Sequence, residues 1–145
     1  MIVYLDASAL VKRYLAEAGS PEVARLIADS TAVGTSLISR AEVAAAIARS
    51  VRAGGIPRTA GEKALRALSA QWADLMALPV TGPLVGRAAE LAWTYGLRGY
   101  DALHLSSALS WQEDLGEPVV VATFDRELAA AARQAGMQTW PAELG

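Results

Sequence analysis

The sequence predicts an α/β domain in which a parallel sheet is covered by helices on both faces. Two short runs, Ile2–Leu5 and Pro118–Thr123, are apolar without alternation, as in strands buried on both faces. Between and after them, apolar residues recur at the three- and four-residue spacing of helices. Strands that alternate with helices are typical of parallel sheets. With 145 residues, the chain is expected to form one domain, residues 1–145.

The remaining elements follow from local patterns and from glycine and proline positions. Gly19 and Pro21 separate the first two helices, and Gly54 closes an alanine-rich helix that begins at Ser39. Gly96 and Gly136 end two later helices. The expected helices are residues 8–18, 21–29, 39–53, 58–76, 84–95, 101–111 and 126–134. The expected strands are residues 2–5, 31–36, 78–80, 118–123 and 137–140.

The segment from Ser39 to Met76 is predicted to be a helical pair inserted between neighbouring strands. Its second helix carries an apolar stripe formed by Leu65, Leu68, Trp72 and Leu75. Such a stripe indicates a buried helix face, which can belong to the core or to a dimer interface.

Composition excludes several classes of function. The chain has no cysteine, which rules out disulfides and thiolate metal sites. It has no glycine-rich phosphate-binding motif. No secretory signal or bilayer-length apolar run is recognisable, so a cytoplasmic protein without membrane contact is expected. The net charge of −2 argues mildly against a nucleic-acid partner, although 11 arginines against 2 lysines can form a local basic rim.

Four carboxylates are candidates for a common site. Asp6 and Asp125 follow the two strongest strands, and ligands of open α/β sheets bind at the carboxyl ends of strands. Glu42 and Asp101 open helices that can face the same edge. Clustered carboxylates repel one another unless cations neutralise them, and Mg²⁺ or Mn²⁺ prefers oxygen ligands. One or two such ions would suit hydrolysis of a phosphodiester.

Each carboxylate also has a purely structural interpretation. Asp6, Asp101 and Asp125 are good N-cap residues, and Ser39 with Glu42 matches a capping box. These alternatives remain open for each residue taken alone.

Three polar residues near the predicted site are equally ambiguous. His104, the only histidine, is either packed and hydrogen-bonded or catalytic. Ser8 and Thr123 are hydroxyl residues beside the strand ends. They either bond to backbone groups or hold a metal-bound water.

Four motifs, in order, carry a resemblance to a known family. Asp6–Leu10, Arg40–Val43, Tyr100–His104 and Val121–Leu128 together resemble PIN-domain ribonucleases, specifically the VapC-type toxins of prokaryotic toxin–antitoxin systems. The resemblance implies a three-layer α/β/α fold with a five-stranded parallel sheet. It also implies an endoribonuclease that depends on Mg²⁺ or Mn²⁺.

The same resemblance implies site residues and partners. The metal and catalytic residues would be Asp6, Glu42, Asp101 and Asp125, of which Asp125 corresponds to the most variable position. Thr123 resembles the hydroxyl residue often found near that metal. The implied partners are an RNA substrate, a second copy of the chain and a cognate antitoxin whose C-terminal tail blocks the site.

Three functional hypotheses follow. The leading one is metal-dependent cleavage of RNA by an activated water. A non-catalytic PIN-like module that binds proteins is the second. The third is aspartyl phosphotransfer by Asp6, which is disfavoured because position 8 is serine in place of a second aspartate and because the only lysines are Lys12 and Lys63.

Overall fold

The computed structural model describes residues 1–144 and contains a five-stranded parallel sheet with the strand order β3-β2-β1-β4-β5. This confirms the predicted α/β class. The first strand therefore lies in the centre, where it is protected on both edges. The strands are β1 (Ile2–Leu5), β2 (Ala32–Ser36), β3 (Met76–Leu78), β4 (Val119–Ala122) and β5 (Gln138–Trp140).

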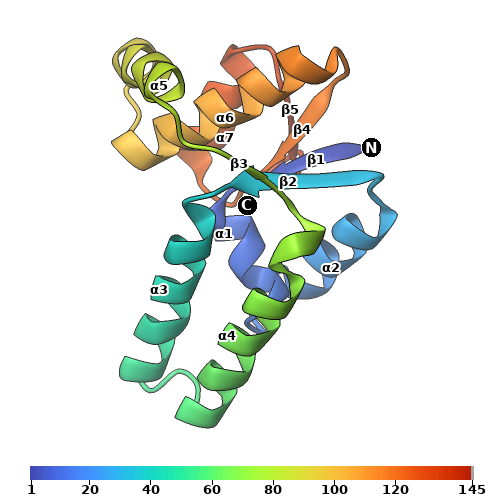
Figure 1. Cartoon of the computed structure of the whole chain (residues 1–145), viewed down its shortest axis with the longest axis vertical. Helices are drawn as coiled ribbons and strands as arrows, with labels where there is room; N and C mark the ends of the chain where they lie inside the picture. The colour runs from blue at the N-terminus through green and yellow to red at the C-terminus, as the bar shows by residue number, and fades with distance from the viewer. Residues whose placement is uncertain (145) are drawn as a thin grey trace.

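Helices cover both faces of the sheet and so give three layers (Figure 1). The first four pack on one face and the last three on the other. The helices are α1 (Ala7–Leu10), α2 (Ser20–Asp29), α3 (Ser39–Arg52), α4 (Arg58–Gln71), α5 (Gly82–Tyr95), α6 (Gly99–Leu115) and α7 (Arg126–Gln134). Single 3₁₀ turns at Val11–Arg13 and Trp72–Asp74 extend α1 and α4.

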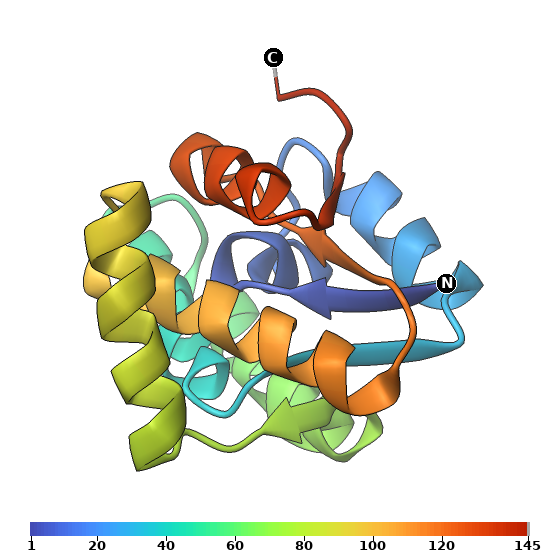
Figure 2. The ribbon, with the colours of Figure 1, turned by 90° about the horizontal axis from the view of Figure 1, so that it is seen from above.

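The topology reverses between β1 and β4. The chain builds outward from β1 through β2 to β3, then returns to the other side of β1 for β4 and β5. Leu5 at the end of β1 lies opposite Ala122 at the end of β4. The loops after these two strands therefore diverge from one point, the usual place for a ligand in an open α/β sheet. Figure 2 shows β1 pointing away from the N-terminus toward the side where α5 and the start of α6 lie.

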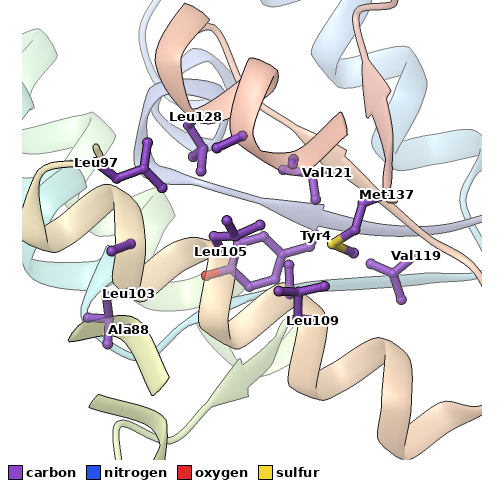
Figure 3. Close-up of a cluster of buried hydrophobic side chains, with 14 of the residues drawn as sticks. Tyr4, Ala88, Leu97, Leu103, Leu105, Leu109, Val119, Val121, Leu128 and Met137 are labelled. Atoms are coloured by element: carbon purple, nitrogen blue, oxygen red, sulfur yellow. The ribbon is translucent and has the colours of Figure 1, made fainter. Parts of the chain in front are cut away.

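Alternation along β1 divides the core into two parts. Tyr4 faces α5, α6 and α7, while Val3 and Leu5 face α1 to α4. All three are completely buried. Figure 3 shows the Tyr4 ring among the apolar side chains of the first part, near Leu105 and Leu109 of α6. Burial of such side chains on both sheet faces is the main stabilising contribution.

Helices α3 and α4 form the predicted pair between the neighbouring strands β2 and β3, and they project away from the sheet (Figure 1). Leu68 is buried against α3, and Trp72 and Leu75 pack on the same cluster. Leu65, by contrast, is exposed. Three of the four residues in the apolar stripe therefore pack in the core, which is one of the two roles that the sequence left open.

Several helix bounds differ from the sequence prediction. Helix α1 with its 3₁₀ turn ends at Arg13, short of the expected residue 18, and α5 begins at Gly82, two residues early. Helix α6 begins at Gly99, two residues before Asp101, and continues to Leu115. The N-cap of α3 is Ile38, which places Ser39 inside the helix. No helix within residues 1–144 has the length and apolarity that crossing a membrane requires.

Candidate active site

Asp6 lies at the reversal point, directly after β1, and is 3% exposed. Its Oδ1 accepts the Ala9 N–H at 3.0 Å, so Asp6 does cap α1. The same oxygen accepts the Ser8 hydroxyl at 2.7 Å, and Oδ2 accepts the Thr123 hydroxyl at 2.6 Å. The cap interpretation is therefore correct but incomplete, because one cap bond does not account for both carboxylate oxygens.

The two predicted hydroxyl residues join the ends of β1 and β4. Ser8 Oγ accepts the Phe124 N–H at 2.9 Å, and Thr123 Oγ1 accepts the Asp125 N–H at 3.0 Å. Both hydroxyls donate to Asp6. Their structural role is thereby visible, while a role in holding water stays a prediction.

The surroundings of Asp6 favour a nearby positive charge. Burial raises the pKa of the Asp6 carboxyl, and His104 together with the hydrogen-bond donors Thr123, Ser8 and Ala9 opposes this rise. A carboxylate removed from water gains more from a cation than an exposed carboxylate does, because the local dielectric constant is lower.

Asp125 and Asp101 share one arginine. Asp125 caps α7 through the Leu128 N–H at 2.9 Å, as predicted, and its Oδ2 accepts from Arg98 Nη2 at 3.0 Å. Asp101 Oδ2 accepts from Arg98 Nε at 3.1 Å. Burial raises the pKa of Asp101, and the Asp125 carboxylate raises it further, while Arg98 lowers it.

The N-cap prediction for Asp101 is wrong. The N-cap of α6 is Arg98, and Asp101 stands in the first turn, where a carboxylate still benefits from the helix dipole. Arg98 itself was missed by the sequence analysis. Its spacing of three residues from Asp101 is a recognised signal for an ion pair, although the link to Asp125 is not local.

The capping box predicted for Ser39 and Glu42 is also absent. The Ser39 hydroxyl lies 2.7 Å from Thr35 Oγ1, which in turn lies 2.7 Å from the Leu5 carbonyl oxygen. These contacts anchor the start of α3 to the end of β1. Glu42 is consequently free of a capping role, and its Oε1 accepts from His104 Nε2 at 2.8 Å.

His104 is packed and hydrogen-bonded, as one of its two interpretations held. Its ring is 2% exposed on α6, and Nδ1 lies 2.7 Å from the Tyr4 hydroxyl. Burial raises the pKa of Tyr4 well above its usual range. The histidine thus connects the central strand to Glu42, a contact that the sequence analysis did not anticipate.

All four predicted carboxylates line a single cavity of about 1300 Å³. Its walls come from α3, from α5 with the segment before it, and from the first turn of α6. Small side chains such as Ala45 and Ala89 keep it wide, and Arg49 and Arg98 supply positive charge. A cavity of this size exceeds what a single ion needs and suits an extended ligand.

The four carboxylates do not form a preassembled metal site. Within residues 1–144, no three acidic or histidine side chains are close enough to enclose a metal ion as they stand. The reason is visible in their partners: Asp101 and Asp125 point to Arg98, and Glu42 points to His104. The donor set consists of oxygen atoms, which is the kind that Mg²⁺ or Mn²⁺ prefers. In the structure, the Arg98 guanidinium lies against two of its members, Asp101 and Asp125.

Comparisons with known proteins identify the family of the chain. The PIN domain family model matches residues 3–134. Ribonuclease VapC49 of Mycobacterium tuberculosis is 36% identical over 144 residues, 99% of this chain and 97% of that protein. Ribonuclease VapC46 of the same species is 32% identical over 135 residues, 93% of each chain.

Solved structures share the fold at lower identity. The FitAB complex bound to an IR36 DNA fragment contains a chain with a TM-score of 0.68 and 19% identity, with 99% of this chain and 98% of that chain covered. Mycobacterium tuberculosis VapC20, a toxin that cleaves the sarcin–ricin loop, has a TM-score of 0.64 and 20% identity, with 89% and 94% covered. The resemblance seen in the four motifs is thereby confirmed, and the chain belongs to the PIN-domain family.

Proposed function

We propose that this protein is an endoribonuclease that depends on Mg²⁺ or Mn²⁺ and acts as the toxin of a toxin–antitoxin pair. The observation that carries the proposal is that Asp6, Glu42, Asp101 and Asp125 all line one cavity at the reversal point of the sheet. Relatives that match nearly the whole chain are named ribonucleases, which supports RNA as the substrate.

The metal ligands in this proposal are Asp6, Glu42 and Asp101, with Asp125 as an assisting ligand. When bound there, the divalent ion supplies an activated water and neutralises charge on the phosphate. The chain itself prepares the ligands. Two hydroxyl groups and a backbone N–H orient Asp6, and His104 orients Glu42. Oriented ligands lose little freedom on binding.

We propose that Arg98 releases its two carboxylate partners when the divalent ion binds. It is exposed, with 75% of its side chain accessible, and its guanidinium forms ion pairs with Asp101 and Asp125. Once a divalent ion satisfies these two carboxylates, the guanidinium is left at the mouth of the cavity. There, together with Arg49, it meets the phosphates of RNA, for which the planar guanidinium is well suited. Arginines gathered at one site allow a chain with a net charge of −2 to bind a polyanion locally.

A homodimer and an antitoxin are the proposed protein partners. Val85 and Trp93 on α5 expose large apolar surfaces, and Trp93 is 91% exposed. An exposed tryptophan of this kind is a suitable anchor for a protein contact, because tryptophan is enriched among the residues that dominate interfaces. The FitAB structure, as its name states, is a complex on DNA, and its shared fold supports a comparable arrangement here.

The experiment is an RNA cleavage assay on purified protein with Mg²⁺, with Mn²⁺ and with a chelator. Wild-type protein should cleave only with a divalent ion. Asp6→Asn should lose more than about 100-fold in rate, since even groups that merely orient metal ligands are worth about 10–100-fold. Asp114→Asn, which alters an exposed carboxylate at the far end of α6, is the matched control and should cleave like wild type.

Two outcomes would redirect the proposal. Equal cleavage by Asp6→Asn and wild type would remove the site from the reaction. A folded wild-type protein that binds no Mn²⁺ and cleaves no RNA would favour the non-catalytic binding module. Aspartyl phosphotransfer gains no support from the structure, because Lys12 bonds to Glu17 and to the Ala18 carbonyl outside the cavity.

A further inference from the structure

We propose that Tyr4 and His104 are positioning residues that hold the Glu42 carboxylate in the site through a continuous chain of hydrogen bonds. The inference rests on the proposed function for the role of Glu42. It adds two residues that do not themselves carry negative charge, one of which lies in the core and does not line the cavity.

The chain of bonds joins three elements that are far apart in sequence. The Tyr4 hydroxyl on β1 lies 2.7 Å from His104 Nδ1 on α6. His104 Nε2 lies 2.8 Å from Glu42 Oε1 on α3. Since β1 is the central strand and α3 belongs to the projecting pair, this series of hydrogen bonds links the buried centre of the sheet to the wall of the cavity.

The order of donors along the chain follows from the chemistry of its ends. An ionised carboxylate only accepts hydrogen bonds, so His104 Nε2 must carry the proton that faces Glu42. A tyrosine hydroxyl is protonated at neutral pH, since its usual pKa is about 10. It can therefore donate to Nδ1 of a neutral imidazole. Tyr4 thus selects the ring tautomer that serves Glu42, as hydrogen-bond partners commonly do for histidine.

Packing holds this arrangement in place. The Tyr4 and His104 rings meet edge to face, with centroids 5.9 Å apart and planes inclined by 66°. Figure 3 shows the Tyr4 ring enclosed by apolar side chains, and both Tyr4 and His104 are buried. Glu42 is less buried than these two rings. Because 26% of its side chain is accessible, its carboxylate can turn to water when the hydrogen bond to His104 is lost.

The hydrogen bond from His104 to Glu42 would favour metal binding in addition to stabilising the fold. A glutamate has three rotatable side-chain bonds, and fixing it before a ligand arrives removes an ordering cost from binding. Groups that orient metal ligands typically change metal affinity or activity by about 10–100-fold. A residue that merely fills the core would change neither.

Two substitutions at His104 separate orientation from packing. Glutamine places its amide N–H close to the position of Nε2, whereas the shorter asparagine reaches only the position of Nδ1. We expect His104→Asn to weaken Mn²⁺ binding by about 10–100-fold in calorimetric titration. His104→Gln should stay within about threefold of wild type, because it restores a donor to Glu42.

Tyr4→Phe tests the end of the hydrogen-bond series that is farthest from Glu42. It deletes one oxygen from a residue that does not line the cavity, so any effect on Mn²⁺ affinity must travel through His104. A loss of about tenfold is expected. Val119→Ala, which alters the same part of the core but lies opposite Ile2 in the sheet, is the control for lost stability and should bind Mn²⁺ like wild type.

The sole histidine permits a readout that requires neither metal nor RNA. With one imidazole in the protein, its nitrogen and carbon NMR signals need no assignment among residues. At alkaline pH the wild-type spectrum should show the tautomer with its proton on Nε2, and Tyr4→Phe should show a mixture. An Nδ1–H tautomer in wild type would overturn the inference, as would His104→Asn or Tyr4→Phe protein that binds Mn²⁺ with wild-type affinity.

These readouts keep the inference separate from the proposed function. Wild-type protein with the Nε2–H tautomer that neither binds Mn²⁺ nor cleaves RNA would contradict the function and leave the hydrogen-bond chain intact. Wild-type protein that binds and cleaves, with no effect of His104→Asn, would contradict the positioning role alone.

Discussion

At the scale of single residues, Asp6 shows how one side chain serves both the fold and the site. Its bond to Ala9 caps α1, while its bonds to Ser8 and Thr123 tie the ends of two strands together. Hydrogen bonds to a charged acceptor are among the stronger ones in proteins. The residue is therefore oriented by contacts that the fold needs in any case.

Removal of the Thr123 hydroxyl should destabilise the protein. Thr123→Val keeps the shape but deprives the buried Asp6 of a bond at 2.6 Å, so the free energy of unfolding should fall by about 1–3 kcal/mol. Urea denaturation measures the change. Thr123→Ser, which retains the hydroxyl and loses only the methyl group, is the control; a Thr123→Val protein as stable as wild type would contradict the contribution of the bond.

Arg98 should weaken the binding of Mn²⁺ and strengthen the binding of RNA. Because it competes for Asp101 and Asp125, Arg98→Ala should bind Mn²⁺ about two- to fivefold more tightly in calorimetric titration. The same variant should have a higher KM for RNA, since a phosphate contact is lost. Arg58→Ala, which removes an exposed arginine of α4 paired with Glu62, should change neither quantity. Weaker Mn²⁺ binding by Arg98→Ala would contradict the exchange of partners.

At the scale of elements, the close approach of α6 to β2 depends on a missing side chain. A Cβ atom at Gly34 would lie 2.6 Å from the Trp111 ring, which is too close for two carbon atoms that are not bonded to each other. Trp111 is buried on α6, the helix that also carries Asp101 and His104. The packing of this pair thus sets how α6 lies against the sheet.

Gly34→Ala should therefore lower the free energy of unfolding by about 1–3 kcal/mol through overpacking. Gly86→Ala is the control on α5, where a Cβ would meet nothing within 4 Å. That change should stabilise the protein by about 0.5–1 kcal/mol, because alanine is the better helix former. Chemical denaturation of both variants checks the sign, and an unchanged midpoint for Gly34→Ala would show that α6 yields easily.

Sequence patterns predicted the elements well where the signal is local. The apolar runs of β1 and β4 and the glycines that end helices placed most boundaries within a few residues. The two site helices were less predictable. Ser39 bonds to Thr35 instead of capping α3, and α6 starts before Asp101 because Arg98 takes the N-cap position. The contact of Ser39 lies outside its helix, and Arg98 takes the N-cap position without any side-chain capping bond that a sequence pattern could indicate.

At the scale of the whole molecule, the strand order decides which carboxylates meet. Asp6 and Asp125 were predictable as neighbours once both strands were recognised, because strand ends share an edge. The contacts of Arg98 with Asp125 and of His104 with Tyr4 and Glu42 were not. They join residues 27, 100 and 62 positions apart, and no local pattern encodes such pairs.

Ion binding at this site should stabilise the whole fold. A ligand that binds only the folded chain at 100 times its Kd contributes about 2.7 kcal/mol. For a chain of this size that corresponds to a rise in Tm of about 5–10 °C. Thermal melts with saturating Mn²⁺ should show this shift in wild type and lose it in Asp6→Asn. A shift of equal size in both proteins would place the ion elsewhere.

The most direct measurement follows the atoms of the reaction. RNA is incubated with wild-type protein and Mn²⁺ in water enriched in oxygen-18, and the product ends are identified by mass spectrometry. Attack by a metal-activated water predicts linear phosphate ends that carry one heavy oxygen, formed only with the divalent ion and not by Asp6→Asn. Products ending in a 2′,3′-cyclic phosphate, or cleavage that persists in a chelator, would contradict hydrolysis at the four-carboxylate site.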